Sequence, residues 1–503
     1  MAGQLSLPGL DEAPAVGALS HRLRTDRRTD TTDDLPGEAY CRQHSALARR
    51  PFGITLTPDW LVARLLAAAG ASGYDTLVDC GAGSGRFALA AARACPKTRV
   101  LAVESHPEML ALLRCRVVQS GLASRVTVLA GDFRDVALDL VGRALFIGNP
   151  PYVRHHDITP EWKHWYRRGM ASRGIVASQL AGLHGHFMLR AVQAMRPGDG
   201  LCFVTAAEWL DNGYGSALRA LCSTSDVQVA GLWVAGADDA VFDDALVSAA
   251  VLHLRATPTP VTASVGRIAG KALHTLRQVP PATLAASQRW SEFSRERLPL
   301  LAAGTPLGEM FRITRGQVTG LNGVWVLPAD QSLLPDHLTL RSVTRAREII
   351  DDAVGSPQAA SRLKRVADLP TDLEALAPAD RASAHRFIKL AQQAGAHQSY
   401  VARHRTPWYC LNLRPPPAAL VSYMGRRPPV FRANPQQLTY LNIAHGLYPR
   451  QPLPTAALAG LLGYLNQAVD MHSGRVYGGG LVKFEPGDVA RLTVPSSCLD
   501  GLE

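Results

Sequence analysis

The stretch LVDCGAGSGRF, residues 77–87, reads as a short apolar strand, a glycine-rich turn and the first residues of a helix. Glycines at Gly81, Gly83 and Gly85 let the backbone approach a bound molecule where side chains would collide with it. A turn of this kind after the first strand of an α/β sheet binds NAD and other nucleotide-containing cofactors. The stretch therefore predicts an α/β fold with a cofactor at this turn, and other residues must identify the cofactor.

Strands and helices alternate on both sides of this turn. An amphipathic helix is predicted with Thr57 as its N-cap and Pro58 as its first helical residue. Further runs predict strands at residues 99–105, 125–133, 143–149, 201–210, 227–236 and 246–256, with helices at 86–95, 107–121 and 184–200. Strands separated by helical patterns of about ten to fifteen residues form βαβ units, so we expect a doubly wound, mostly parallel sheet.

The chain of 503 residues is too long for a single core. Residues 1–40 are polar and have no period, which predicts a mobile N-terminal arm. Residues 41–260 hold the alternating strands and helices, and residues 261–300 lose that alternation and are interpreted as a linker. Residues 301–503 mix short strands, turns and a helical stretch, which predicts a second domain of mixed α+β structure.

The distribution of charge favours nucleic acid as a partner. The formal net charge is +11 and the isoelectric point is near 9.5. Residues 401–450 contain seven arginines and no acidic residue. Arginines without acidic neighbours suit a phosphate backbone better than a self-neutralised surface.

Several other classes of protein and site are excluded. The chain has no run of about eighteen apolar residues and no apolar segment of a secretory signal, so we expect neither a membrane span nor export. Its eight cysteines stand singly, which indicates reduced thiols in the cytoplasm and no structural metal. His155 and His156 lack a third metal ligand, and Asp157, Glu161 and Lys163 are too tightly spaced for a nuclease site.

Acidic residues at the ends of two later strands narrow the choice of cofactor. Glu104 ends the second strand, where an acid accepts hydrogen bonds from a ribose diol in NAD and in S-adenosylmethionine alike. Asp132 and Phe133 end the third strand, where a carboxylate can hold an adenine amino group and a ring can cover the adenine face. Because NAD sites do not add this pair, the set favours S-adenosylmethionine.

The fourth strand runs into FIGNPPYVR, residues 146–154. An exocyclic aromatic amine is a poor nucleophile because its lone pair is delocalised into the ring. The side-chain oxygen of Asn149 and the backbone carbonyl of Pro150 can each accept one N–H, which draws the nitrogen toward tetrahedral geometry. Two successive prolines hold both acceptors in place, and Tyr152 offers a stacking face. This pattern predicts methyl transfer to an amino nitrogen.

Over about residues 50–256, and more loosely to the C-terminus, these motifs resemble the γ-class N6-adenine DNA methyltransferases of bacterial restriction–modification systems, those with NPPY. The resemblance implies S-adenosylmethionine as cofactor, double-stranded DNA as partner and base flipping. It leaves open whether a separately encoded restriction endonuclease is a further partner. It implies cofactor contacts at Thr57, Asp79, Gly81, Gly83, Glu104, Asp132, Phe133 and Phe187. It implies catalytic roles for Asn149, Pro150, Tyr152 and Phe242, with the two aromatic residues on either side of the extruded base. Cys80 stands where the family often has a proline.

Residues 311–327 and 474–495 resemble segments that begin and close the target-recognition domain of this family. The stretch MGRRPPVFRANP, residues 424–435, carries arginines on a segment stiffened by prolines. The candidates for DNA contact are Arg315, Arg426, Arg427, Arg432 and Lys483.

The sequence thus predicts a cytoplasmic, site-specific DNA methyltransferase that modifies adenine N6 and has no nuclease of its own. One alternative is an NPPY enzyme that acts on RNA or on a glutamine of translation release factors. Another is a non-catalytic DNA-binding specificity protein that has kept the fold, which would not bind S-adenosylmethionine.

Overall fold

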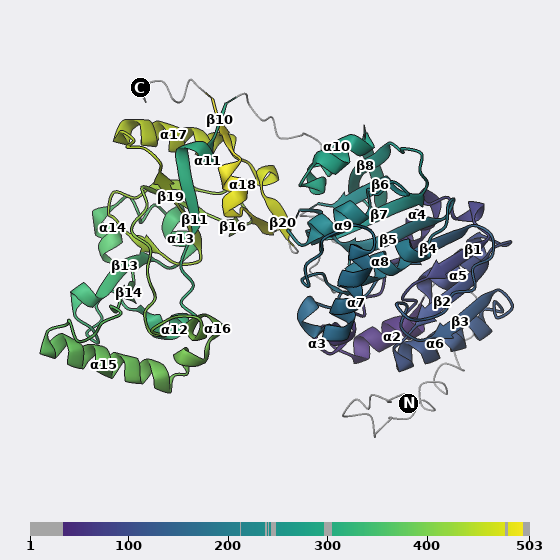
Figure 1. The fold of residues 1–503 in the computed structure, drawn as a ribbon, viewed down its shortest axis with the longest axis horizontal. Coiled ribbons are helices and arrows are strands. Elements are labelled where there is room, and N and C mark those ends of the chain that lie inside the picture. The colour runs from purple at the N-terminus through teal and green to yellow at the C-terminus, as the bar shows by residue number, and fades with distance from the viewer. Residues whose placement is uncertain are drawn as a thin grey trace. The chain divides into compact units, whose positions relative to one another are not determined.

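The computed structural model describes residues 34–211, 213–236, 239, 241–242, 248–295, 304–477 and 481–495. The chain divides into two compact units, Met1–Glu296 and Arg297–Glu503, which are coloured from purple to teal and from green to yellow in Figure 1. The part of the predicted arm before Asp34 lies outside the described residues.

The first unit is built on a nine-stranded sheet with the order β3-β2-β1-β4-β5-β7-β6-β8-β9. Its strands are β1 (Thr76–Asp79), β2 (Arg99–Glu104), β3 (Val126–Ala130), β4 (Ala144–Gly148), β5 (Gly200–Ala206), β6 (Val227–Ala235), β7 (Ala249–Ala256), β8 (Ala263–Ala269) and β9 (Ala272–Val279). Neighbouring strands from β3 to β5 pair in parallel, whereas β7 and β9 run antiparallel to their neighbours. The predicted doubly wound, mostly parallel sheet is confirmed.

Helices cover both faces of this sheet (Figure 1). They are α2 (Leu35–Gln43), α3 (Ala46–Arg49), α4 (Asp59–Ala68), α5 (Arg86–Ala94), α6 (Pro107–Gln119), α7 (Pro160–Ala171), α8 (Leu183–Ala194), α9 (Gly215–Leu221) and α10 (Pro281–Ala286). Apolar residues of α4, α5 and α6 pack with Leu77 and Ile147 on one face, and those of α7, α8 and α9 pack with Val78 and Phe146 on the other. Successive residues of β1 thus point into opposite layers.

Three predicted boundaries are wrong. Residues 34–40 do not belong to an arm, because Asp34 accepts a hydrogen bond from Gly37 N at 2.9 Å and caps α2. The described part of segment 261–300 is not a linker, because β8 pairs with β6 and β9 pairs with β8, which extends the sheet. Helix α4 begins after Pro58 rather than at it, because a ψ angle of 141° keeps Pro58 extended.

The second unit contains short strands in several small sheets, as the prediction of mixed α+β structure expects. The sheets have the orders β10-β22, β11-β19-β15-β17, β12-β14-β13-β18 and β16-β21-β20. The strands are β10 (Thr305–Pro306), β11 (Phe311–Arg315), β12 (Val326–Leu327), β13 (Thr339–Val343), β14 (Arg365–Ala367), β15 (Ala419–Ser422), β16 (Met424–Gly425), β17 (Phe431–Ala433), β18 (Thr439–Tyr440), β19 (Ala444–Pro449), β20 (Arg475–Tyr477), β21 (Leu481–Lys483) and β22 (Thr493–Val494). The helices are α11 (Leu307–Met310), α12 (Asn322–Trp325), α13 (Ala346–Ile350), α14 (Pro357–Ser361), α15 (Pro378–Gln393), α16 (Tyr400–Arg403), α17 (Thr455–Ala468) and α18 (Pro486–Ala490).

Separate cores hold this unit together. Helix α17 packs its leucines against β11, β15, β17 and β19, whereas α15 packs against Trp325 and the sheet that contains β14. In the part of the chain that is described, no helix is long and apolar enough to span a bilayer.

Candidate functional site

Predicted cofactor and catalytic residues follow the carboxyl ends of four adjacent parallel strands. Asp79 ends β1, Glu104 ends β2, Asp132 follows β3, and Asn149 follows β4. In the sheet register Asp79 pairs with Ile147 of β4 and with Ala102 of β2. The structure therefore brings these residues, which span 70 positions of sequence, to one edge of the sheet, where open α/β folds bind ligands.

The glycine turn after β1 is tied directly to the end of β2. Gly83 N donates to Glu104 Oε2 at 2.7 Å, while Ser105 N and His106 N donate to Oε1 at 2.8 and 2.7 Å. Gly83 has a φ of +53°, and a Cβ there would meet nothing within 4 Å, so this side of the turn is open. Burial raises the pKa of the Glu104 carboxyl. Glu104 thus fixes the turn and keeps acceptor capacity for a ribose, because two carboxylate oxygens offer about four lone-pair sites.

Asp79 lies beneath the same turn and is fully buried. Its Oδ2 accepts from Ala88 N in α5 at 3.0 Å, and its Oδ1 has no hydrogen-bond partner among the described residues. Burial raises the pKa of Asp79 to about 8, and the nearby Glu104 charge adds to the shift. Asp79 therefore joins β1 to α5 through its hydrogen bond to Ala88, and its burial disfavours the charged form. Gly81 lies between the turn and the catalytic loop, since a Cβ there would be 3.6 Å from Phe187 and Pro151.

The predicted adenine contacts form an aromatic layer and an ion pair. Phe133 and Phe187 are buried, with ring centroids 5.2 Å apart. Both oxygens of Asp132 accept from the Arg134 guanidinium, at 2.9 and 2.5 Å. The guanidinium carbon of Arg134 in turn lies 3.8 Å from the centroid of the Trp162 ring. Arg134 therefore holds the Asp132 carboxylate in place, and an adenine amino group would share that carboxylate with it.

The two polar atoms of the Asn149 carboxamide differ in their hydrogen bonding. Its Nδ2 donates to the backbone oxygen of Thr55 at 3.3 Å, whereas its buried Oδ1 has no partner among the described residues. A buried carbonyl oxygen without a donor costs roughly 1–3 kcal/mol, so such an atom calls for an external partner. The hydrogen bond to Thr55 fixes which end of the carboxamide is the acceptor. This geometry supplies the acceptor that the sequence predicted for an amino nitrogen.

The two predicted base-stacking residues meet in the structure. Tyr152 and Phe242 have ring centroids 6.3 Å apart and an interplanar angle of 73°. Burial raises the pKa of the Tyr152 hydroxyl, so this residue is neutral. Phe242 is only 4% exposed. Because the rings touch edge to face, a base enters between them only after they separate or rotate.

Segment 49–57 contains residues that the sequence reasoning missed. A Cβ at Gly53 would lie 2.5 Å from Tyr152 N and 2.8 Å from Pro151 Cβ, so only glycine lets the segment reach the NPPY loop. Arg49 Nη1 donates to Ile54 O at 3.2 Å, and Arg86 Nη1 donates to Thr57 O at 2.9 Å. Buried Thr57 thus lies beside the glycine turn. The segment connects the cofactor turn to Asn149. The sequence feature that could have identified it is the Phe52-Gly53 dipeptide before an extended run.

Gly53→Ala should lower the single-turnover rate of methyl transfer about 100-fold, because a shift of about 1 Å in a reacting group can cost that much. Its control is Gly70→Ala. Gly53 and Gly70 have φ angles of +65° and +62°, but a Cβ at Gly70 would meet nothing within 4 Å. Both variants incur the same backbone strain, and only Gly53→Ala pushes on Tyr152. Equal rates for the two variants would show that the contact with the NPPY loop is unimportant.

The predicted DNA-binding residues of the second unit differ in their partners. Arg315 and Lys483 both pair with Glu485, the latter at 2.6 Å. Arg432 pairs with Asp352 at 3.3 Å. Arg427 is exposed, and Arg426 is exposed but interacts within the chain. Three of the five predicted cations are therefore partly neutralised by acidic residues outside the arginine-rich segment.

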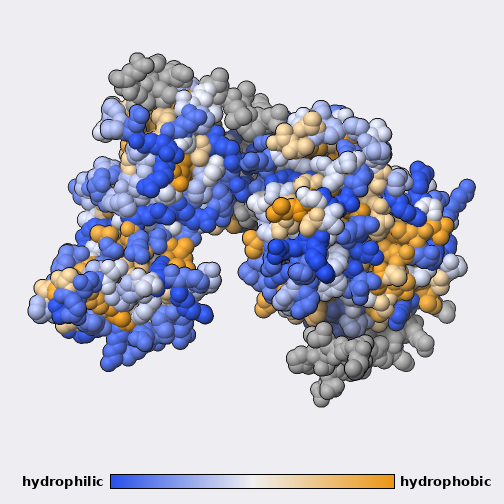
Figure 2. Space-filling view, viewed as in Figure 1, coloured by the Kyte–Doolittle hydropathy of each residue, from blue (hydrophilic) through white to orange (hydrophobic). Residues whose placement is uncertain are grey.

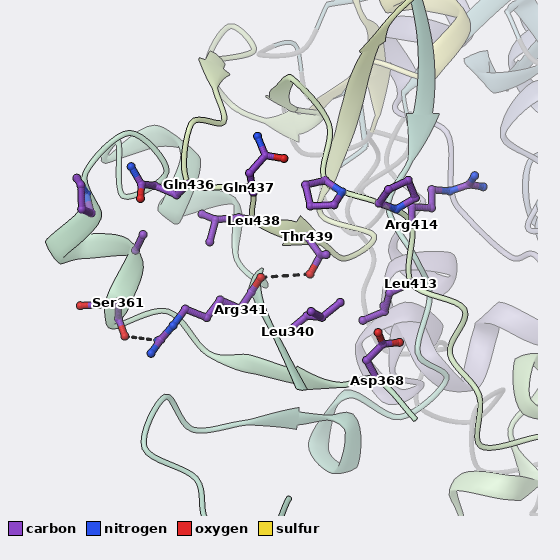
Figure 3. Close-up of a pocket in the computed structure, with 14 residues that line it drawn as sticks. Leu340, Arg341, Ser361, Asp368, Leu413, Arg414, Gln436, Gln437, Leu438 and Thr439 are labelled. Carbon is purple, nitrogen blue, oxygen red and sulfur yellow. Dashed lines mark hydrogen bonds between the residues drawn. The ribbon is translucent and has the colours of Figure 1, made fainter. Parts of the chain in front are cut away.

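The second unit also contains a groove of about 520 Å³ between β13, α14 and the segments 413–416 and 436–439 (Figure 3). Its lining is mixed, with leucine and proline surfaces beside Arg341, Asp368 and two glutamines. Arg341 is occupied by a hydrogen bond to Ser361 O. None of the residues predicted for methyl transfer lines this groove. Within the described residues there is also no cluster of three or more side chains suited to a metal ion.

Comparisons with known proteins match the two units to one kind of enzyme. A general methyltransferase domain matches residues 77–157, the Eco57I restriction-modification methylase matches residues 144–229, and the C-terminal domain of type II methyltransferase M.Eco57I matches residues 297–502. The type II methyltransferase M.XamI of Xanthomonas campestris pv. amaranthicola is 41% identical over 452 residues, which covers 88% of this chain and 85% of that protein.

Two further similarities are more limited. The structure of the type IIL restriction-modification enzyme MmeI in complex with DNA superposes with a TM-score of 0.59 at 12% identity, over 91% of this chain and 70% of that one, and so supports the fold. The release factor glutamine methyltransferase of Moorella thermoacetica is 40% identical over 82 residues, which covers 16% of this chain and 27% of that protein.

Proposed function

The chain belongs to the type II methyltransferases of restriction–modification systems, and on that basis we propose that it methylates N6 of adenine in double-stranded DNA, with S-adenosylmethionine as methyl donor. One observation carries the choice of an amino nitrogen. The buried Oδ1 of Asn149 has no partner among the described residues, while Nδ2 is held by Thr55. An amino group is the donor that such an oxygen accepts.

The residues at the sheet edge fit S-adenosylmethionine. The turn at Gly83 is open, Glu104 retains acceptor capacity for a ribose, and Phe133 with Phe187 supplies an apolar wall. When bound, the cofactor supplies a methyl group on a positively charged sulfur. We assign the ribose to Glu104, the adenine to Asp132 and Phe133, and the methionine end to Thr57.

The protein groups act on the amine of the target base. Asn149 Oδ1 and Pro150 O each accept one of its N–H groups, which frees the nitrogen lone pair from the ring. That lone pair would be the nucleophile toward the methyl group that the bound cofactor would supply, with the bonding electrons of the methyl group left on the sulfur. One proton leaves the nitrogen for solvent. Neutral acceptors suit this step because they stabilise the developing positive charge on nitrogen and are already in place before the reaction.

A target base reaches this loop only outside the duplex. Unstacking it costs roughly a few kcal/mol. Stacking on an aromatic residue returns about 1–3 kcal/mol. Tyr152 and Phe242 provide two such rings, and we assign the extruded base to the space that opens between them when the rings separate or rotate.

The test is to incubate the protein with methyl-labelled S-adenosylmethionine and unmodified genomic DNA, then digest the DNA to nucleosides for mass spectrometry. Label in N6-methyl-2′-deoxyadenosine supports the proposal, whereas label only in N4-methyl-2′-deoxycytidine refutes the choice of base. Sequencing of the modified positions then gives the recognition site. The last step is to test whether the methylated DNA resists cleavage by a separately encoded endonuclease of the same system. Such resistance would support a role in restriction–modification in the cytoplasm.

The short match to a release factor glutamine methyltransferase favours a second candidate, a glutamine amide. Such a substrate offers the same kind of nitrogen to Asn149. It leaves the second unit, which matches the M.Eco57I C-terminal domain, without a role. Parallel reactions with a purified release factor and with structured RNA separate these substrates from duplex DNA.

A further inference from the structure

Helix α7 comes shortly after the NPPY loop and presents a row of basic residues that the proposed chemistry does not use. The residues His164, Arg167 and Arg168 are exposed, and Arg154 is exposed in the loop before the helix. We call these four residues the α7 face. Strongly hydrophilic residues over α7 are visible on the first unit in Figure 2.

The helix is oriented by its apolar side. Tyr166 and Met170, one turn apart, are buried in the core that includes α8. Trp162 lies under the Arg134 guanidinium and anchors the first turn. Positions 164, 167 and 168 have the i, i+3, i+4 spacing of a single helix face, so packing of the opposite side turns all three outward.

These cations are not neutralised by neighbouring acids. No ion pair involves Arg154, Arg167 or Arg168 in the described part of the chain, whereas Arg173, just beyond the helix, is paired with Asp226 at 2.7 Å. The acidic residue of the helix is Glu161 in its first turn, where the helix dipole favours an acid. Arg315 and Lys483 differ from these arginines, because both pair with the carboxylate of Glu485.

The α7 face also lies close to the catalytic loop. Arg154 comes two residues after Tyr152, and the start of α8 is held to the same loop by a hydrogen bond from Leu183 N to Val153 O at 3.0 Å. Twelve residues of helix span about 18 Å. One strand of duplex DNA carries a phosphate for about every 3.4 Å of the duplex axis, so a helix of this length can meet phosphates that flank the extruded base.

We propose that the α7 face binds the phosphate backbone of duplex DNA next to the flipped base, so that the catalytic unit contributes its own sequence-independent DNA contacts. This proposal rests on the proposed function, since it takes DNA as the substrate. Arginine suits the role because its guanidinium is always charged and binds phosphate in a bidentate manner. These contacts would position the duplex and leave recognition of its sequence to other residues.

The test measures the affinity of the full-length protein for a fluorescent random-sequence duplex of about 30 base pairs over a range of salt concentrations. In Arg167→Ala/Arg168→Ala, the slope of log Kd against log salt should fall by about 1.5–2, since each lost phosphate contact accounts for about 0.9. The matched control is Arg93→Ala/Arg114→Ala. Both of these arginines are exposed on α5 and α6, which pack on the opposite face of the sheet.

The control variant should keep the wild-type slope, and its rate at saturating DNA should stay within about two-fold of wild type. An unchanged slope in Arg167→Ala/Arg168→Ala, or an equal loss in the control, would overturn the role of α7. If either outcome is found while the wild-type protein methylates DNA normally, the proposed function stands and only the role of α7 is refuted. Failure of the wild-type protein to bind or methylate duplex DNA would instead remove the proposed function itself.

Discussion

Replacing Asn149 with alanine should lower the rate of methyl transfer about 100- to 1,000-fold, as expected for loss of one preorganised polar group at a reacting centre. The affinities for S-adenosylmethionine and DNA should remain near normal. Among the described residues, the Asn149 side chain donates to Thr55 O, and its Oδ1 accepts no hydrogen bond from the glycine turn or any other group. The interaction it supplies is therefore made mainly as the amine becomes nucleophilic, which affects kcat rather than binding.

Asn149→Asp provides a graded comparison. Aspartate keeps an acceptor at the position of Oδ1 but replaces the Nδ2 donor with a second oxygen, which would then face Thr55 O at about the 3.3 Å of the present hydrogen bond. Two acceptors at that distance repel each other, so the carboxylate should rotate or take up a proton. We expect a rate between those of the wild type and Asn149→Ala. The difference in rate between the two variants measures what the acceptor atom contributes to methyl transfer. The difference between Asn149→Asp and the wild type measures what its fixed orientation contributes.

Single-turnover kinetics with methyl-labelled cofactor measure the chemical step, and isothermal titration calorimetry measures cofactor affinity. A rate for Asn149→Ala within a few-fold of wild type would show that the amide does not act on the target nitrogen. Loss of cofactor binding in parallel with the rate would indicate that the substitution disturbs the glycine turn instead.

The fold was largely predictable because its signals are local. Strands β1, β2, β4 and β5 are short, largely buried runs, and such runs separated by helical patterns specify a doubly wound sheet. The hairpin of β8 and β9 was missed because β9 is mostly exposed and polar, with a burial pattern that gives no clear alternation. Its place in the sheet comes from pairing with β8, which is a tertiary contact rather than a local preference.

The residues of the candidate site likewise fall into those that the local sequence predicts and those that only tertiary contacts reveal. Residues at strand ends, such as Glu104 and Asn149, could be predicted because parallel strands end at one edge of the sheet. Several partners that orient them could not be predicted, because they come from other segments of the chain: Gly83 donates to Glu104 from 21 residues away. Thr55 supplies the carbonyl for Asn149 from 94 residues away. Asp34 meets the glycine turn across 50 residues, and its local sequence gives only the pattern of a polar arm.

Asp34→Ala is expected to be strongly destabilising. The carboxylate is buried, forms ion pairs with Arg86 Nε at 2.9 Å and Arg116 Nη1 at 3.0 Å, and accepts a hydrogen bond from the hydroxyl of Ser84. Removing one partner of a buried ion pair costs about 3–5 kcal/mol, because it leaves an uncompensated charge in the interior. The change also removes the N-cap of α2, at about 1 kcal/mol. Because Ser84 and Arg86 belong to the glycine turn, affinity for S-adenosylmethionine should fall as well.

The matched control is Asp139→Ala, which removes an ion pair of similar length from the surface. Asp139 pairs with Arg99 at 2.8 Å, but its side chain is 77% exposed, so the expected cost is about 0–1 kcal/mol. Urea unfolding of the two variants measures the difference. Asp34→Ala/Arg116→Ala should recover part of the loss, since one of the two stranded guanidinium groups is then gone. If Asp34→Ala and Asp139→Ala unfold at the same urea concentration, the cluster does not hold α2 against the turn.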